Sequence, residues 1–372
     1  MPDNTIQKAH EIGQSIWFDY ISRDLIDSGE LKRLVDSGVR GVTSNPSIFQ
    51  SAISGSSDYD YSLVRYSTQA PDAVGIFELV AIDDVRDAAD VLRPVYDSSN
   101  RADGFVSIEV NPLLAAKTDE TIAEARRLHA AIDRPNIMIK VPGTPEGVPA
   151  IRKLISEGIN VNVTLLFSLS AYAAAAKAYV DGLADYVESG GDDLGGISGV
   201  ASFFVSRVDT SADDALENVS RGDEIAGKIG IANARLAYEA FQTSTASERW
   251  QELSARGALP QRPLWASTGV KNPAYSDVLY MNELMGVNTV NTAPPATLDA
   301  FLDHGEVSER VTVGVDDARS HIARLEELGI SLDTITDDLL AAGVKAFADA
   351  FEGLMGVIDS KLRELSGAPA SD

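Results

Sequence analysis

The chain has 372 residues, 44% of them hydrophobic, and a formal net charge of −25 at pH 7. This length and composition suffice for one large domain with a buried core. So acidic a surface disfavours nucleic acid and anionic membranes as partners, and an anionic substrate would need a local basic pocket.

The sequence also argues against several kinds of chemistry. It has no cysteine, which excludes disulfides, thiol nucleophiles and thiolate metal sites. Its four histidines are far apart and form no metal-ligand motif, and no cofactor fingerprint is visible, so we expect no metal and no cofactor. No apolar run reaches the roughly 18 residues of a membrane span, and Met1–Tyr20 lacks the pattern of a signal peptide. We therefore expect a cytoplasmic protein, and a homo-oligomer is compatible with the sequence.

Strand-like and helix-like segments alternate along the chain. The expected strands are Ile16–Tyr20, Gly41–Ser44, Gly104–Val110, Ile137–Val141, Asn160–Leu166, Val200–Val205, Leu264–Ser267 and Asn288–Asn291. The expected helices between them include Leu31–Val35, Phe77–Tyr96, Asp119–Ile132, Ser170–Glu188, Glu224–Arg256 and Ser276–Met285. Eight such units predict an α/β fold, a single (β/α)8 TIM barrel. The alternative is an open doubly wound sheet, but no G-x-G-x-x-G motif follows the first strand.

The segment after the eighth strand is longer than one barrel helix. It predicts extra C-terminal helices at Ala296–Leu302, Asp316–Leu328 and Asp337–Arg363. The last has apolar residues at three- to four-residue spacing, so we expect it to pack over the barrel. Residues 366–372 are expected to be a disordered tail. No repeat or linker is visible, and residues 1–372 are predicted to form one catalytic domain.

Lys140 lies inside an apolar strand, with Met138 on its face and Ile137, Ile139 and Val141 on the other. An ammonium group is costly there unless it is paired, and burial favours the neutral amine, which can attack a carbonyl carbon. An isolated lysine of this kind more often extends its charged end to water.

Polar residues interrupt other expected strands as well, mostly near their carboxyl ends. They are Asp19, Asn45, Glu109, Asn162, Thr164 and Ser267, the last of which alternation places on the face of Trp265. Each alone is better explained as a satisfied core residue. Together, at the end of a barrel that carries active sites, they predict one polar site. An amine, two carboxylates and several amides and hydroxyls favour carbonyl chemistry on a sugar through an imine.

Three segments resemble signatures of the transaldolase family. Residues 41–47, Gly-Val-Thr-Ser-Asn-Pro-Ser, resemble its first signature, and Ile139–Pro142 with Gly147 resembles its Schiff-base lysine signature. Residues 159–168 resemble the strand that follows. Order and spacing agree from about Trp17 to Asn291, and residues 265–272 resemble the longer bacterial transaldolases.

The resemblance implies four catalytic residues. Lys140 would form the Schiff base with a ketose donor, and Asp19 would move the donor's hydroxyl proton as the carbon–carbon bond breaks. Glu109 and Thr164 would position a water for imine formation and hydrolysis. The implied reaction moves a dihydroxyacetone unit from sedoheptulose 7-phosphate to glyceraldehyde 3-phosphate, giving erythrose 4-phosphate and fructose 6-phosphate.

The resemblance also implies substrate-binding residues: Asn45 and Asn162 for the dihydroxyacetone fragment, Ser202 and Phe204 for the pocket wall, and Arg207 and Ser267 for phosphate. Many family members have an arginine two residues after the matching serine, whereas this chain has Gly269, with Lys271 the nearest cation. Two other functions compete with transfer. One is a Schiff-base aldolase that releases free dihydroxyacetone, and the other is a barrel that only binds sugar phosphate.

Overall fold

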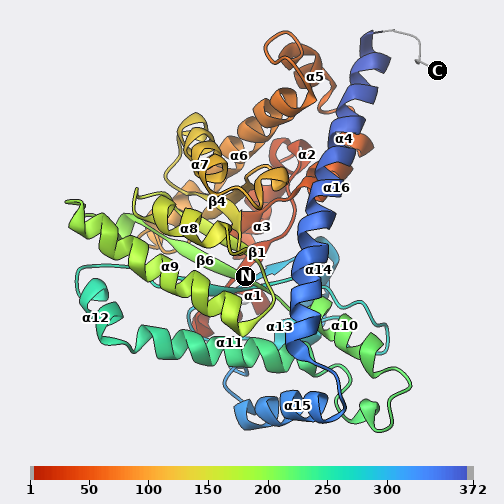
Figure 1. Cartoon of the computed structure of the whole chain (residues 1–372). Coiled ribbons are helices and arrows are strands. Elements are labelled where there is room, and N and C mark those ends of the chain that lie inside the picture. The colour runs from red at the N-terminus through yellow and green to blue at the C-terminus, as the bar shows by residue number, and fades with distance from the viewer. Residues whose placement is uncertain (1–3, 367–372) are drawn as a thin grey trace.

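The computed structural model describes residues 4–366, which contain a closed barrel of eight parallel strands surrounded by helices (Figure 1). The strands are β1 Gln14–Phe18, β2 Gly41–Thr43, β3 Phe105–Glu109, β4 Ile137–Pro142, β5 Val161–Leu166, β6 Gly199–Phe204, β7 Arg262–Ala266 and β8 Thr289–Ala293. Each strand pairs with the next, and β8 pairs with β1. This closure confirms the predicted TIM barrel and excludes the open sheet.

The helices before the eighth strand are α1 Thr5–Ile12, α2 Arg23–Asp27, α3 Glu30–Ser37, α4 Pro46–Gly55, α5 Asp60–Tyr66, α6 Ala73–Ser98, α7 Thr118–Ile132, α8 Gly147–Ile155, α9 Leu169–Glu188, α10 Ser206–Leu216, α11 Ile229–Thr245, α12 Glu248–Ser254 and α13 Leu279–Glu283. After it come α14 Pro295–His304, α15 Val315–Glu327 and α16 Leu332–Ser366. The described residues also contain short 3-10 helices, η1 Pro112–Leu114, η2 Leu194–Gly196 and η3 Gly222–Glu224. None of the helices within residues 4–366 combines the length and apolarity that crossing a bilayer requires.

Several predicted boundaries differ from the structure. The single helix expected over Glu224–Arg256 is divided into η3, α11 and α12, because the side chain of Ser247 accepts a hydrogen bond from the Trp250 backbone and begins a new helix. The first strand ends at Phe18, so Asp19 lies just beyond it. The tail was expected to begin at residue 366, which is one residue too early, since Ser366 closes α16; residues 367–372 lie outside the described part.

Alternation along the strands divides the core into an inner and an outer part. Trp17, Phe105, Met138 and Leu264 belong to one apolar cluster that fills the barrel. Their strand neighbours, Trp265 among them, pack in a second cluster against the helices. Two residues further along the inward faces come Asp19, Lys140 and other polar side chains. The barrel therefore has an apolar floor and a polar carboxyl end.

The last helix, α16, has 35 residues and extends along one whole side of the molecule in Figure 1. It packs against α4, α5, α6, α10 and the end of β5. A Cβ added at Gly343 would lie 3.0 Å from Leu165 on β5, so the helix sits close to the barrel there. The prediction of a C-terminal helix over the barrel is correct, and it brings Phe347 to the carboxyl end of the strands.

Candidate active site

Lys140 lies between two polar neighbours in the sheet, because the strand register pairs it with Glu109 on β3 and with Asn162 on β5. The residue is only 6% exposed. Its Nζ donates a hydrogen bond of 2.8 Å to the backbone oxygen of Ser44 and lies 3.9 Å from Oε1 of Glu109. The sequence predicted that a lysine at this position would be buried, and a carboxylate and a carbonyl oxygen offset the cost of burying its amine.

The pKa of Glu109 is strongly perturbed by its surroundings. Burial raises its pKa from 4.5 to about 7, against the lowering effect of Lys140, and the nearby Asp19 carboxylate adds to the rise. Its Oε2 is buried and has no hydrogen-bond partner among residues 4–366. A carboxyl group with a pKa near neutrality can both give and take a proton, as general acid–base catalysis requires.

Asp19 follows β1 and lies near Lys140. It accepts a hydrogen bond of 2.5 Å from Oγ1 of Thr43, which in turn is 2.7 Å from Oγ1 of Thr292. Burial raises the pKa of Asp19, and the Thr43 hydrogen bond and the charge of Lys140 oppose the rise. Thr43 belongs to the Thr-Ser-Asn-Pro motif, which was the signal that could have assigned it a place in the site.

The amide residues take different positions. Asn162 is fully buried, donates to Oγ of Ser107 at 3.1 Å and accepts from Oγ of Ser202 at 2.6 Å, so it lies beneath the cavity. Asn45 caps α4 by accepting from the Ile48 backbone, and its amide lines the cavity. Thr164 is buried and also lines it.

Cationic groups lie at the other end of the cavity. Arg207 is in the first turn of α10, with its guanidinium carbon 5.3 Å from the ring centre of Phe204. Burial lowers the pKa of Arg207, and no carboxylate in the described ranges forms an ion pair with it. Lys271 is exposed, and its Nζ lies 4.0 Å from the position that a Cβ on Gly269 would take. The lysine head group thus lies next to the position at which the family resemblance predicts an arginine.

Ser267 reaches the cavity in a way that alternation did not predict. Trp265 faces the helices, where its indole nitrogen donates to the Leu284 backbone oxygen, so the face assigned to Ser267 was wrong. The strand ends at Ala266, and a left-handed φ of 55° turns Ser267 back toward the cavity. Its Oγ lies 2.8 Å from Oγ of Ser206, beside Arg207.

These groups surround a cavity of about 170 Å³ at the carboxyl end of the barrel. Of the side chains predicted from the sequence, Glu109 and Asn162 alone lie outside its lining. The sequence analysis had assigned no role to Thr43, Gly269, Thr292, Pro294 and Phe347, which also line it. Phe347 comes from α16, and its ring centre lies 5.9 Å from Nζ of Lys140. No group of three His, Asp or Glu side chains in the described structure is arranged to hold a metal ion.

The fold and this cavity define a TIM-barrel protein with a buried amine and two carboxyl groups at its carboxyl end. Comparison with known proteins identifies the family. The sequence model described as transaldolase/fructose-6-phosphate aldolase matches residues 16–358, and the chain belongs to this family.

Similar curated proteins cover almost the whole chain. The transaldolase of Trichodesmium erythraeum is 43% identical, over 98% of this chain and 100% of that protein. Transaldolase 2 of Nostoc punctiforme is 46% identical, with the same coverage. Transaldolase 1 of Streptomyces avermitilis is 47% identical, over 97% of each chain.

Proposed function

We propose that the chain is a transaldolase that transfers a dihydroxyacetone unit from sedoheptulose 7-phosphate to glyceraldehyde 3-phosphate. The products are erythrose 4-phosphate and fructose 6-phosphate. One observation carries this proposal: a single cavity has the buried Lys140 amine and the Asp19 carboxyl group at one end, with the Glu109 carboxyl group 3.9 Å behind the amine. At its other end lie cations, and Arg207 among them has no ion-pair partner among residues 4–366. A phosphorylated ketose offers a carbonyl to the first end and an anion to the second.

Lys140 would attack the ketose carbonyl carbon and form an imine. Asp19 would then take the proton of the hydroxyl group whose carbon is released, while the electrons of the breaking bond move toward the imine nitrogen. The burial that raises the pKa of Asp19 suits it to this exchange of a proton. The remaining three-carbon fragment must be kept from water until the acceptor aldehyde arrives, and Phe347 of α16 lies where it can shield it.

Glu109 and Thr164 would position the water molecule that leaves on imine formation and returns on hydrolysis. The position of the Glu109 carboxylate, 3.9 Å from the amine, supports a direct role in this proton transfer. Asn45 and Ser202 would contact the fragment through the cavity wall. Asn162 would act from below, because its side chain oxygen holds the Ser202 hydroxyl.

Arg207, Ser267 and Lys271 would bind the phosphate. Arg207 can bind a phosphate through two parallel hydrogen bonds, and its guanidinium is largely removed from water. Lys271 is exposed and offers only a point charge. We therefore assign the larger share of phosphate binding to Arg207.

Trapping of the imine tests the proposal. Borohydride reduction in the presence of fructose 6-phosphate should leave a covalent three-carbon adduct on the peptide that contains Lys140, as read by mass spectrometry. Lys153 and Lys177 serve as internal controls, because both are exposed and paired with carboxylates. An adduct on either of them, or no adduct in the protein, would contradict the assignment.

An aldolase that releases free dihydroxyacetone is the second candidate, since the description of the matching family includes such enzymes. Omitting the acceptor aldehyde separates the two functions. A transaldolase should hold the fragment as an imine and release little dihydroxyacetone, whereas an aldolase should release it at every turnover. A barrel that only binds sugar phosphate would keep its affinity in a Lys140→Arg variant and form no adduct.

We also infer one catalytic domain that works in the cytoplasm on phosphorylated sugars and not on nucleic acid. The packing of α16 against helices from the first half of the chain supports the single domain. The net charge of −25 supports the absence of a nucleic-acid partner.

A further inference from the structure

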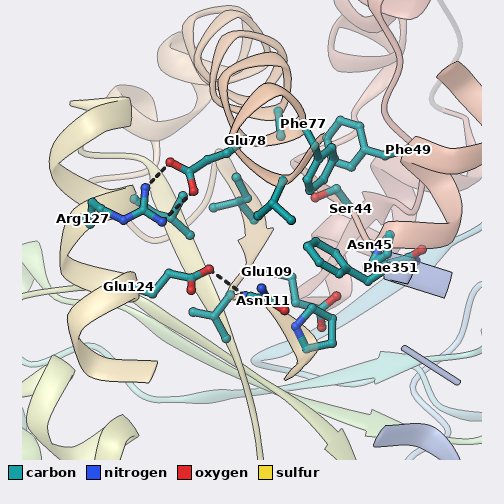
Figure 2. A pocket seen from close by; sticks show the side chains of 17 residues that line it. Ser44, Asn45, Phe49, Phe77, Glu78, Glu109, Asn111, Glu124, Arg127 and Phe351 are labelled. Carbon is teal, nitrogen blue, oxygen red and sulfur yellow. Dashed lines mark hydrogen bonds and ion pairs between the residues drawn. The ribbon is translucent and has the colours of Figure 1, made fainter. Parts of the chain in front are cut away.

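A second cavity lies behind Glu109 (Figure 2). Glu109 lines this cavity and Lys140 does not, while the reverse holds for the substrate cavity. Its volume is about 70 Å³, which a sugar phosphate cannot enter. Much of its wall is apolar, with Phe49, Phe77 and Phe351 on one side in Figure 2. The cavity therefore continues from the catalytic carboxyl group into the space between the barrel and its helices.

The inner end of this cavity contains an unsatisfied acceptor. The side chain of Glu109 is 7% exposed, and its buried Oε2 has no hydrogen-bond partner in residues 4–366. Leaving such an atom unpaired is unfavourable, so a small hydrogen-bond donor is favoured beside it. A water molecule occupies about 30 Å³ in the liquid, and a cavity of this size with polar groups admits a few of them. Asn45 and Asn111 supply further polar groups in the lining.

The outer end of the cavity lies between α6 and α7. Glu124 accepts a hydrogen bond of 2.8 Å from the Asn111 backbone, and burial raises the pKa of Glu124. Beyond it, Arg127 of α7 and Glu78 of α6 form a two-fold ion pair, one bond of which is 2.6 Å. The Arg127 side chain is 52% exposed, so this pair closes the cavity at the protein surface.

We propose that this second cavity is a water passage that serves the imine chemistry at Glu109 while the sugar and Phe347 occupy the substrate cavity. The proposal rests on the proposed function. When the carbinolamine loses its hydroxyl group, the nitrogen lone pair forms the C=N bond and the protonated Glu109 gives its proton to the departing oxygen. The products are water, the iminium ion and the Glu109 carboxylate. Hydrolysis reverses each transfer, and the water leaves or enters on the side of the unpaired Oε2.

Oxygen-18 exchange tests the passage. Each imine formation expels the C2 oxygen of fructose 6-phosphate, so hydrolysis in labelled water places oxygen-18 at C2 if the expelled molecule exchanges with solvent. Transfer is measured in the same mixture, from labelled glyceraldehyde 3-phosphate incorporated into fructose 6-phosphate. The readout is the number of oxygen-18 atoms incorporated per transfer. A protein that shows no transfer and no trapped imine would refute the proposed function itself, which is a separate outcome.

Two variants address the two ends of the passage. Ala81→Leu adds bulk to a buried residue of the cavity wall and should lower the oxygen-18 incorporated per transfer several-fold. Arg127→Gln opens the outer end and should raise the release of free dihydroxyacetone per transfer several-fold. Arg126→Gln is the matched control, because Arg126 on the same helix pairs with Glu157 and lies outside the cavity lining.

The passage is refuted if Ala81→Leu lowers exchange and transfer in the same proportion, or leaves both unchanged. If Ala81→Leu does not fold, the comparison between Arg127→Gln and Arg126→Gln tests the passage instead. Equal dihydroxyacetone release by the Arg126 and Arg127 variants would show that the outer end of the cavity plays no part in water access.

Discussion

The buried carboxyl group of Glu109 should make protein stability depend on pH in a measurable way. Burial raises its pKa in the folded state from 4.5 to about 7. At 1.36 kcal/mol per pKa unit this shift corresponds to about 3 kcal/mol. Because the folded protein holds this proton more tightly than the unfolded chain, the contribution is fully present below pH 4.5. It is lost as the pH rises through 7.

Replacing Glu109 by Gln removes this titration while keeping the size and most of the shape of the side chain. The free energy of unfolding of the Gln variant, relative to the original protein, should therefore increase by about 3 kcal/mol between pH 4.5 and pH 8. Urea unfolding followed by circular dichroism at several pH values measures the difference. A difference that is independent of pH would refute the argument that Glu109 is desolvated and protonated near neutrality.

The same variant separates stability from chemistry. The rate of imine formation, followed by borohydride trapping in single turnovers, should decline above about pH 7 in the original protein, because the acid form of Glu109 is lost. The Gln variant should be slower and should lack this decline. A decline at the same pH in both proteins would assign it to another group.

Three further outcomes are expected. Asp19→Ala should still form a borohydride-trapped imine with fructose 6-phosphate but cleave this imine about 10²–10⁴ times more slowly, and normal cleavage would contradict its role. Arg207→Ala should lower kcat/KM for fructose 6-phosphate more than kcat/KM for fructose, by an amount that corresponds to about 2–3 kcal/mol of transition-state stabilisation. Lys271→Ala should show a smaller loss with the same preference. Equal losses on the two sugars would contradict a role in phosphate binding. Tyr275→Phe removes a hydrogen bond of 2.8 Å to Asp213 on α10 and should raise KM for the phosphorylated sugar with little change in kcat, because this bond holds the segment that carries Lys271.

Most of the barrel's inner surface could be predicted from alternation alone. Met138 and Lys140 share a face because the side-chain period of a strand is two. That Glu109 lies directly beside the lysine follows from the register between β3 and β4, which alternation does not give. The rule holds while the strand lasts. It failed at Ser267, where the strand had ended and a left-handed φ reversed the direction of the side chain.

Other parts of the site depend on contacts that no local pattern contains. Phe347 lies more than two hundred residues from Lys140 in the sequence, and its amphipathic helix predicted packing without indicating which residue enters the cavity. The cavity behind Glu109 is formed where α4, α6, α7 and α16 meet, so its existence depends on how helix surfaces fit together. The break before α12 was different, because Ser247 is a typical N-cap residue and the sequence contained that signal.

At the proposed phosphate end of the site, a cation lies near a position where the family resemblance predicts an arginine. That position is Gly269, and a Cβ there would meet Thr297 at 3.4 Å and Pro294 at 3.7 Å, both ordinary contacts. The backbone therefore does not require glycine. The Nζ of Lys271 lies 4.0 Å from the same point, so a cation is present beside this position although it comes from a residue two places later in the sequence. Because lysine offers a point charge and arginine a planar pair of donors, we expect both residues to attract an anion and Arg207 to supply the directional hydrogen bonds.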